Sequence, residues 1–126
     1  MVRARGALAV LHTHSVWGTL VSDAYAAEGG VHFENYEMLK GLAGVGTHEH
    51  REWLPIFENS QRWTEVVPRL EESLRRRADV HGFLILRHGL YTWGESVSEA
   101  KRHVEILEFL LEVLWRTDRR RDARGR

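Results

Sequence analysis

The feature that most constrains this chain is a short apolar run that leads directly into a His-x-His pair, at residues 8–15 (LAVLHTHS). An apolar run of this length, bounded by polar residues, predicts a buried strand. Side chains two residues apart in a strand point to the same side, so His12 and His14 can converge while Thr13 points away. Two converging imidazoles suit a divalent metal, zinc first, with iron and cobalt also compatible. The alternative is a pair of surface histidines at the start of a helix, and the spacing alone does not exclude it.

A third imidazole is needed to make this pair a metal site, and His88 is the best candidate on local grounds. It follows a second strongly apolar segment at residues 81–86, as His12 and His14 follow the first. If the two strands are neighbours in one sheet, the three imidazoles meet at its end. Three protein ligands with one open position are typical of catalytic zinc. The alternative interpretation of His88 is an ordinary turn residue before Gly89.

Glu37 is the candidate for proton transfer. It lies in the first turn of a short predicted helix, where an acidic side chain is also favoured simply by the helix dipole. Beside a metal-polarised carbonyl it could instead act as a general acid or base. The sequence does not separate these two interpretations.

The remaining histidines are predicted to have no role in catalysis. A second His-x-His pair, His48 and His50, lies in a polar stretch after a glycine-rich loop and is interpreted as surface histidines. His32, His81 and His103 are interpreted as structural or solvent-facing.

Length and composition limit the class of protein. The 126 residues suffice for one domain, and 43% apolar with 29% charged residues is ordinary for a globular protein. The net charge is zero, from 18 basic and 18 acidic residues, so no attraction to nucleic acid or anionic membranes is expected. There is no cysteine, no signal-peptide core and no membrane-spanning run, which favours a cytoplasmic location. Residues 117–126 are expected to be a disordered, Arg-rich tail, with nucleic-acid binding as the alternative.

Strands and helices are predicted to alternate along the chain, so the fold class is α/β or α+β. The predicted helices cover residues 15–23, 36–42, 68–77 and 97–116, and the predicted strands cover 8–14, 31–33, 53–57, 81–86 and 90–93. Pro55 lacks an N–H group, which predicts that its strand lies at an edge or begins late. The last strand is expected to continue the preceding one after a bulge at Gly89. The apolar sector of the last helix is wide, which predicts burial on two sides or contact with another subunit.

Five segments resemble the class II aldolase/adducin superfamily in their order and separation. They are residues 11–15 (LHTHS), 35–42 (NYEMLKGL), 54–59 (LPIFEN), 87–94 (RHGLYTWG) and 102–110 (RHVEILEFL). The resemblance extends from about residue 8 to about residue 115. The second, third and fourth segments favour the branch that dehydrates a methylthio sugar phosphate over the sugar-phosphate aldolases, which are kept as an alternative.

This resemblance implies a mostly antiparallel sheet flanked by helices, within a domain of residues 1–116. It implies one Zn²⁺ per subunit, bound by His12, His14 and His88, with Glu37 as the acid/base. The implied reaction is the dehydration of 5-methylthioribulose 1-phosphate to 2,3-diketo-5-methylthiopentyl 1-phosphate in methionine salvage. The implied assembly is a homotetramer with its active sites near subunit boundaries. The implied partner is thus a small sugar phosphate, with no nucleic acid and no membrane.

The chain departs from the family pattern at its beginning. Family members carry a segment before the His-x-His strand whose loops hold the substrate phosphate, and this chain has only about ten residues there. We therefore expect an N-terminally shortened fold. It could be a fragment or a late-started reading frame, a metal-binding or interaction domain with little or no activity, or a domain that completes itself by oligomerising.

Overall fold

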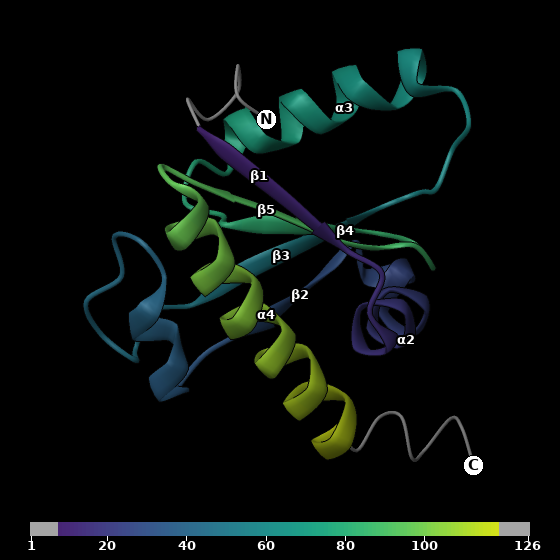
Figure 1. The fold of residues 1–126 in the computed structure, drawn as a ribbon. Coiled ribbons are helices and arrows are strands. Elements are labelled where there is room, and N and C mark those ends of the chain that lie inside the picture. The colour runs from purple at the N-terminus through teal and green to yellow at the C-terminus, as the bar shows by residue number, and fades with distance from the viewer. Residues whose placement is uncertain (1–7, 119–126) are drawn as a thin grey trace.

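A five-stranded sheet organises the fold, with helices on both faces (Figure 1). The computed structural model describes residues 8–118. The strands are β1 (Ala9–Thr13), β2 (Gly30–Phe33), β3 (Glu52–Phe57), β4 (Gly82–Ile85) and β5 (Gly89–Gly94). The helices are α2 (Val16–Tyr25), α3 (Trp63–Arg76) and α4 (Val97–Thr117), with short 3₁₀ helices η1 (Ala26–Glu28) and η2 (Glu37–Gly41). The α+β class is confirmed.

The strand order is β1-β5-β4-β3-β2. The pairs β1–β5, β5–β4 and β3–β2 are antiparallel, and β3–β4 is parallel, so the expectation of a mostly antiparallel sheet is correct. Pro55 does not mark an edge strand, because β3 lies between β2 and β4. Its pairing with β4 begins only at Ile56, one residue after the proline, so the missing N–H group leaves no gap in that ladder.

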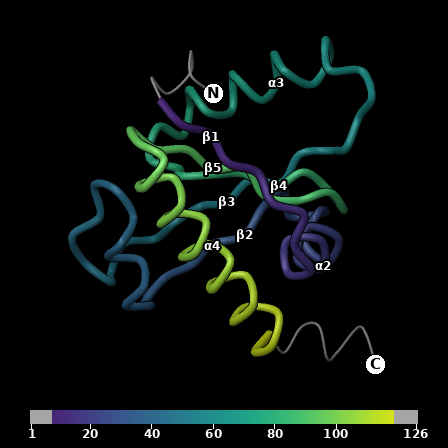
Figure 2. The backbone as a smooth tube through the Cα atoms, viewed as in Figure 1, coloured from purple at the N-terminus to yellow at the C-terminus, as the bar shows by residue number. Residues whose placement is uncertain are grey.

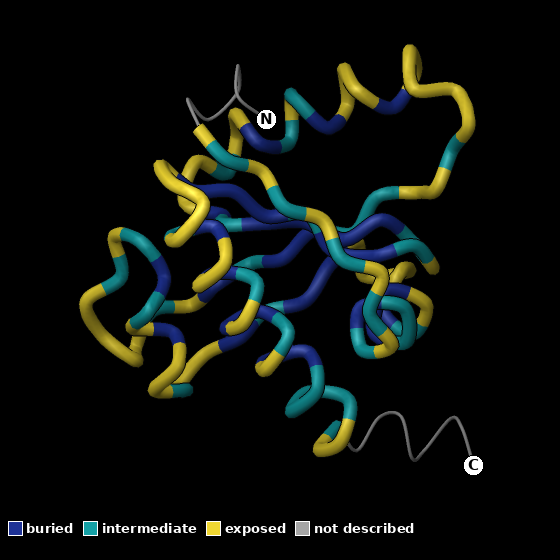
Figure 3. The backbone as a smooth tube through the Cα atoms, viewed as in Figure 1, coloured by how far each residue is buried: buried dark blue, intermediate teal, exposed yellow. Residues whose placement is uncertain are grey.

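Two apolar cores lie on the two faces of the sheet. The larger core joins α2 and α4 to the sheet, and its most buried members include Val21, Leu54, Leu84, Leu90 and Leu107. The smaller core joins α3 to the opposite face through Leu70, Leu74, Phe83, Ile85 and Trp93. Alternate residues of β4 therefore face opposite cores, as the period of a strand requires. Figure 3 shows the buried backbone concentrated in the central strands.

Helix α3 is longer than its sequence suggested. It begins at Trp63 rather than at Pro68, which lies inside the helix. A proline there removes one backbone hydrogen bond. Val66, Leu70 and Leu74 are buried at helical spacing, so burial of this stripe explains why the helix extends through the proline. The helix expected over 36–42 is the 3₁₀ helix η2.

The chain reverses direction after β4, so the predicted continuation of one strand through Gly89 is wrong. Ile85 pairs with Gly89, and the His88 N–H group donates to the Ile85 carbonyl at 3.0 Å. Arg87 adopts a left-handed conformation with φ of 56°, which closes the turn. The backbone trace in Figure 2 shows this tight reversal between β4 and β5.

Helix α4 packs against β1, β5, α2 and η2, which buries Ile106, Leu107, Leu110 and Leu111. Its wide apolar sector is therefore covered from several sides within one chain, while Phe109 stays 45% exposed. No helix in residues 8–118 has both the length and the apolar character to cross a membrane. The expected Arg-rich tail lies outside the described residues from position 119 onward.

Candidate metal centre

The structure brings the side chains of His12, His14 and His88 together. Their ring centroids lie 4.6 Å apart for His12 and His14, 5.0 Å for His12 and His88, and 4.9 Å for His14 and His88. One nitrogen from each ring lies within 4.8 Å of the other two. Among residues 8–118, no other three histidine or acidic side chains form such a group.

Sheet pairing explains this convergence. Thr13 at the end of β1 pairs with Leu90, two residues after His88, so the end of β1 lies beside the β4–β5 turn. The approach is close at Gly89, where an added Cβ atom would lie 1.8 Å from the carbonyl oxygen of Thr13. Only a glycine fits between the two strands at this point. On the other side of β1, the Thr13 hydroxyl donates to Oε2 of Glu108 on α4 at 2.7 Å.

Neighbouring groups orient two of the rings. Nδ1 of His12 donates to the Leu90 carbonyl at 2.8 Å, and the His12 ring stacks on Tyr91 with a centroid separation of 3.9 Å. Nδ1 of His88 lies 3.3 Å from the side-chain oxygen of Asn59. Burial, together with the charges that His12 and His14 carry when protonated, lowers the pKa of His88. A lowered pKa favours the neutral ring, which is the form that binds a metal.

The donor set fits a zinc ion. Nitrogens bound to one tetrahedral zinc at about 2.0–2.1 Å lie roughly 3.3 Å apart, so small rotations of these exposed side chains suffice to close the site. Because Nδ1 of His12 is committed to a carbonyl, its Nε2 atom carries the free lone pair. The site is open to solvent, with His12 and His14 exposed and His88 half-buried, which leaves room for a further ligand.

Glu37 does not lie with the three histidines. It is on η2, and its carboxylate is 75% exposed, 3.0 Å from Nζ of Lys40 and 3.7 Å from Nδ1 of His48. Figure 1 shows η2, the blue coil on the left, at the opposite end of the sheet from the β4–β5 turn. Within one chain, Glu37 therefore cannot reach a metal held by the three histidines.

A second polar cluster was missed in the sequence. Glu52 is fully buried and accepts hydrogen bonds from Nε2 of His50 at 2.7 Å and from Nδ1 of His81 at 2.9 Å. Burial acts to lower the pKa of His81, but the Glu52 carboxylate and the Ala43 carbonyl together outweigh burial and raise it. His50 is thus not a simple surface histidine. The signal available in the sequence was that Glu52 directly precedes the strand predicted at 53–57 and follows His50 by two residues.

His103 is structural, as interpreted from the sequence. It is 2% exposed, donates through Nδ1 to the Trp93 carbonyl at 2.7 Å, and accepts the Ala43 N–H group at Nε2. Burial is the main reason that its pKa is lowered.

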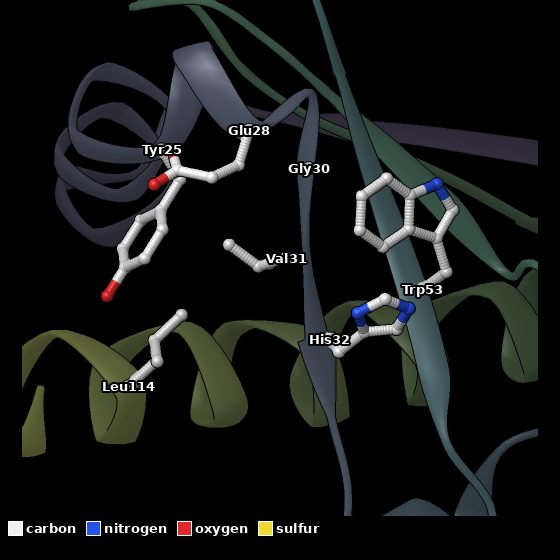
Figure 4. Close-up of a pocket in the computed structure, with 7 residues that line it drawn as sticks. All are labelled: Tyr25, Glu28, Gly30, Val31, His32, Trp53 and Leu114. Atoms are coloured by element: carbon white, nitrogen blue, oxygen red, sulfur yellow. The ribbon is translucent and has the colours of Figure 1, made fainter.

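Cavities along the sheet differ in their distance from the three histidines. One of about 430 Å³ lies between Tyr25, Trp53 and Leu114, away from the three histidines (Figure 4). Another of about 340 Å³ lies between α3 and the sheet and is mostly apolar. Tyr91 lines this second cavity and also stacks on His12, so the cavity adjoins the histidine cluster.

Comparison with known proteins places these features in a family. The profile described as "Class II Aldolase and Adducin N-terminal domain" matches residues 1–115. A protein named methylthioribulose-1-phosphate dehydratase from Picosynechococcus sp. is 48% identical over 107 residues, covering 85% of this chain and 50% of the relative. A protein of the same name from Methylococcus capsulatus is 47% identical over 105 residues, covering 83% of this chain and 50% of the relative.

The fold comparison agrees with the sequence comparisons. The crystal structure of YgbL, described as "a putative aldolase/epimerase/decarboxylase from Escherichia coli", matches with a TM-score of 0.55 and 22% identity. The match covers 87% of this chain and 49% of YgbL. The chain thus spans about half the length of the curated relatives that it matches. With the profile match across nearly its whole length, the chain belongs to the class II aldolase/adducin family.

Proposed function

We propose that this chain carries the zinc site of a lyase that dehydrates 5-methylthioribulose 1-phosphate to 2,3-diketo-5-methylthiopentyl 1-phosphate. The convergence of His12, His14 and His88 carries the proposal, in a chain 47–48% identical to proteins named for this reaction. As an enzyme of methionine salvage it would act in the cytoplasm.

The proposed roles follow from the chemistry of the side chains. The three neutral imidazoles hold the ion and leave a position open for the substrate. Bound zinc would polarise the C2 carbonyl of the substrate and so make the proton on C3 more acidic. Glu37 is the group that moves the proton while the C4 hydroxyl leaves as water.

This assignment requires a second copy of the chain. Glu37 is exposed to solvent, and it lies at the far end of the sheet from the three clustered histidines of the same chain. We therefore propose that Glu37 of one copy faces the histidine cluster of another, in a homotetramer. The same arrangement gives the exposed Glu37 a role that its own chain does not provide.

The test combines zinc content with turnover of the purified protein. His88→Ala should lose zinc and turnover, because two imidazoles and solvent replace three protein ligands. Glu37→Gln should keep zinc and lose turnover by about 10²–10⁴-fold. Glu49→Gln, a control at another exposed acidic position of the loop before β3, should keep both. Full zinc occupancy in the His88→Ala protein would overturn the ligand assignment.

Mixed assemblies test whether Glu37 acts across subunits. Co-expressed His88→Ala and Glu37→Gln chains should recover part of the turnover, because some sites then combine intact histidines with an intact Glu37. If mixed assemblies stay inactive while the wild type is active, Glu37 does not act on a neighbouring copy.

A second candidate function is a metal-binding or interaction domain with little or no activity. The observation that favours it is that Glu37 is exposed and lies away from the three histidines within one chain. Zinc binding without turnover of methylthioribulose 1-phosphate supports this alternative. Cleavage of a carbon–carbon bond in a sugar phosphate, without loss of water, identifies a sugar-phosphate aldolase instead.

A further inference from the structure

The side chain of Asn59 has no role in the proposed reaction, yet it contacts the histidine cluster. Its amide oxygen lies 3.3 Å from Nδ1 of His88. Asn59 ends the sequence segment 54–59 (LPIFEN), which leads from β3 into the loop before α3.

Parallel pairing brings these two side chains together. The carboxyl ends of two parallel strands meet at the same edge of a sheet. Phe57 pairs with Ile85 at the ends of β3 and β4, and the Leu86 N–H group donates to the Phe57 carbonyl at 2.8 Å. Asn59 and His88 then follow these ends by two and three residues. The contact is therefore a product of strand order, not of sequence proximity.

The loop that carries Asn59 is held on both sides of this residue. Glu58 forms an ion pair with Arg69 of α3. The Ser60 hydroxyl accepts the N–H group of Arg62 at 2.9 Å, at the start of the same helix. These contacts restrict the positions that the Asn59 amide can take.

The hydrogen bond matters because a neutral imidazole has one N–H group and one lone pair. When Nδ1 donates to an oxygen, Nε2 is left free to bind a metal. The Leu90 carbonyl sets this state for His12. We propose that Asn59 is a positioning residue that does the same for His88, presenting its Nε2 lone pair to the ion. This inference rests on the metal site of the proposed function.

The test uses two readouts on the purified chain. The first is the ring tautomer of His88, measured by ¹⁵N NMR on metal-free protein at about pH 8, where histidine is neutral. The second is the zinc dissociation constant, measured by competition with a chelator. Asn59 is exposed, so its substitution leaves the core intact.

Asn59→Leu should shift His88 away from the Nδ1–H tautomer and weaken zinc binding by about 10–100-fold, as loss of a partner behind a metal ligand does. Asn59→Asp retains an acceptor oxygen and should keep both properties. Gln61→Ala, at an exposed position of the same loop, should change neither, and the His12 tautomer should stay constant throughout.

An unchanged His88 tautomer in Asn59→Leu, or equal weakening of zinc binding by Asn59→Leu and Asn59→Asp, would overturn the inference. The two proposals fail separately. If the wild type binds no zinc, the metal site is wrong, whereas the metal-free tautomer still decides whether Asn59 orients His88.

Discussion

Replacing Glu52 by glutamine should destabilise the protein more than any surface change. Glu52 has no exposed side-chain area. Its carboxylate accepts from the His50 ring at 2.7 Å, the His81 ring at 2.9 Å and the His81 backbone N–H group at 2.9 Å. A glutamine of the same shape places an NH₂ group against donors and leaves at least one of them without an acceptor.

The expected cost follows from two effects. A buried donor left unsatisfied costs about 1–3 kcal/mol. Breaking a buried charged pair costs about 3–5 kcal/mol. Because His81 is 13% exposed, we expect about 3 kcal/mol, near the point where the two ranges meet. A domain of this size has a total stability of about 5–15 kcal/mol, and this loss corresponds to a melting temperature lower by roughly 10–15 °C.

The charge on His81 makes the stability that it gains from Glu52 depend on pH. His81 donates from Nδ1 to Glu52 and from Nε2 to the Ala43 carbonyl at 2.6 Å, so its ring is charged when both bonds are made. Its pKa is raised in the folded state above the value of 6.5. The stability from this pair is therefore complete below about pH 6.5 and lost as the pH rises through the folded pKa. The difference between wild type and Glu52→Gln should therefore shrink as the pH rises above about 6.5.

Urea unfolding with EDTA present, followed by circular dichroism at several pH values, measures this difference. The chelator removes metal binding from the comparison. Glu65→Gln is the matched control, since its carboxylate is 61% exposed and lies 3.5 Å from Arg62; it should change stability by less than about 0.5 kcal/mol. A loss below about 1 kcal/mol in Glu52→Gln, or a difference that does not vary with pH, would refute the reasoning.

Two further substitutions test how the chain is locally built. Gly89→Ala places a Cβ atom 1.8 Å from the Thr13 carbonyl oxygen and 3.2 Å from Cε1 of His12. It should lower the free energy of unfolding by about 3 kcal/mol and weaken zinc binding, as measured by thermal unfolding and zinc titration. A wild-type value in either measurement would contradict the close approach of the two strands. Ser96→Ala removes the acceptor for the Glu99 N–H group at the start of α4 and should cost about 1 kcal/mol in urea unfolding without changing zinc affinity, whereas Ser96→Asp should retain the cap.

The local features of the fold could be predicted because they depend on residues close together in the chain. A serine directly before a helix favours an N-cap, and the side chains of Ser15 and Ser96 accept from the N–H groups of Gly18 and Glu99. The same holds for His12 and His14, whose spacing in a strand directs both rings to one side. The meeting of His88 with His12 and His14 could be predicted only on the condition that the strands before His12 and His88 are neighbours in the sheet.

Other features depended on contacts between distant parts of the chain. The start of α3 at Trp63 and the place of Pro55 inside the sheet are decided by the apolar surface that each segment buries. Glu52 is a charged residue that local preference places at the surface, and only His50 and His81, brought together by the fold, make its burial tolerable.

The sequence by itself therefore determined that His12 and His14 point to one side of a strand. It also determined which faces of the helices are apolar and where the helices are capped, since periodicity and capping act over a few residues. The tertiary structure alone decided that His88 and Asn59 reach the end of β1 and that Glu37 does not. The physical reason is that strand order depends on the burial of apolar surface across the whole domain, and no short segment records which strand will lie beside it.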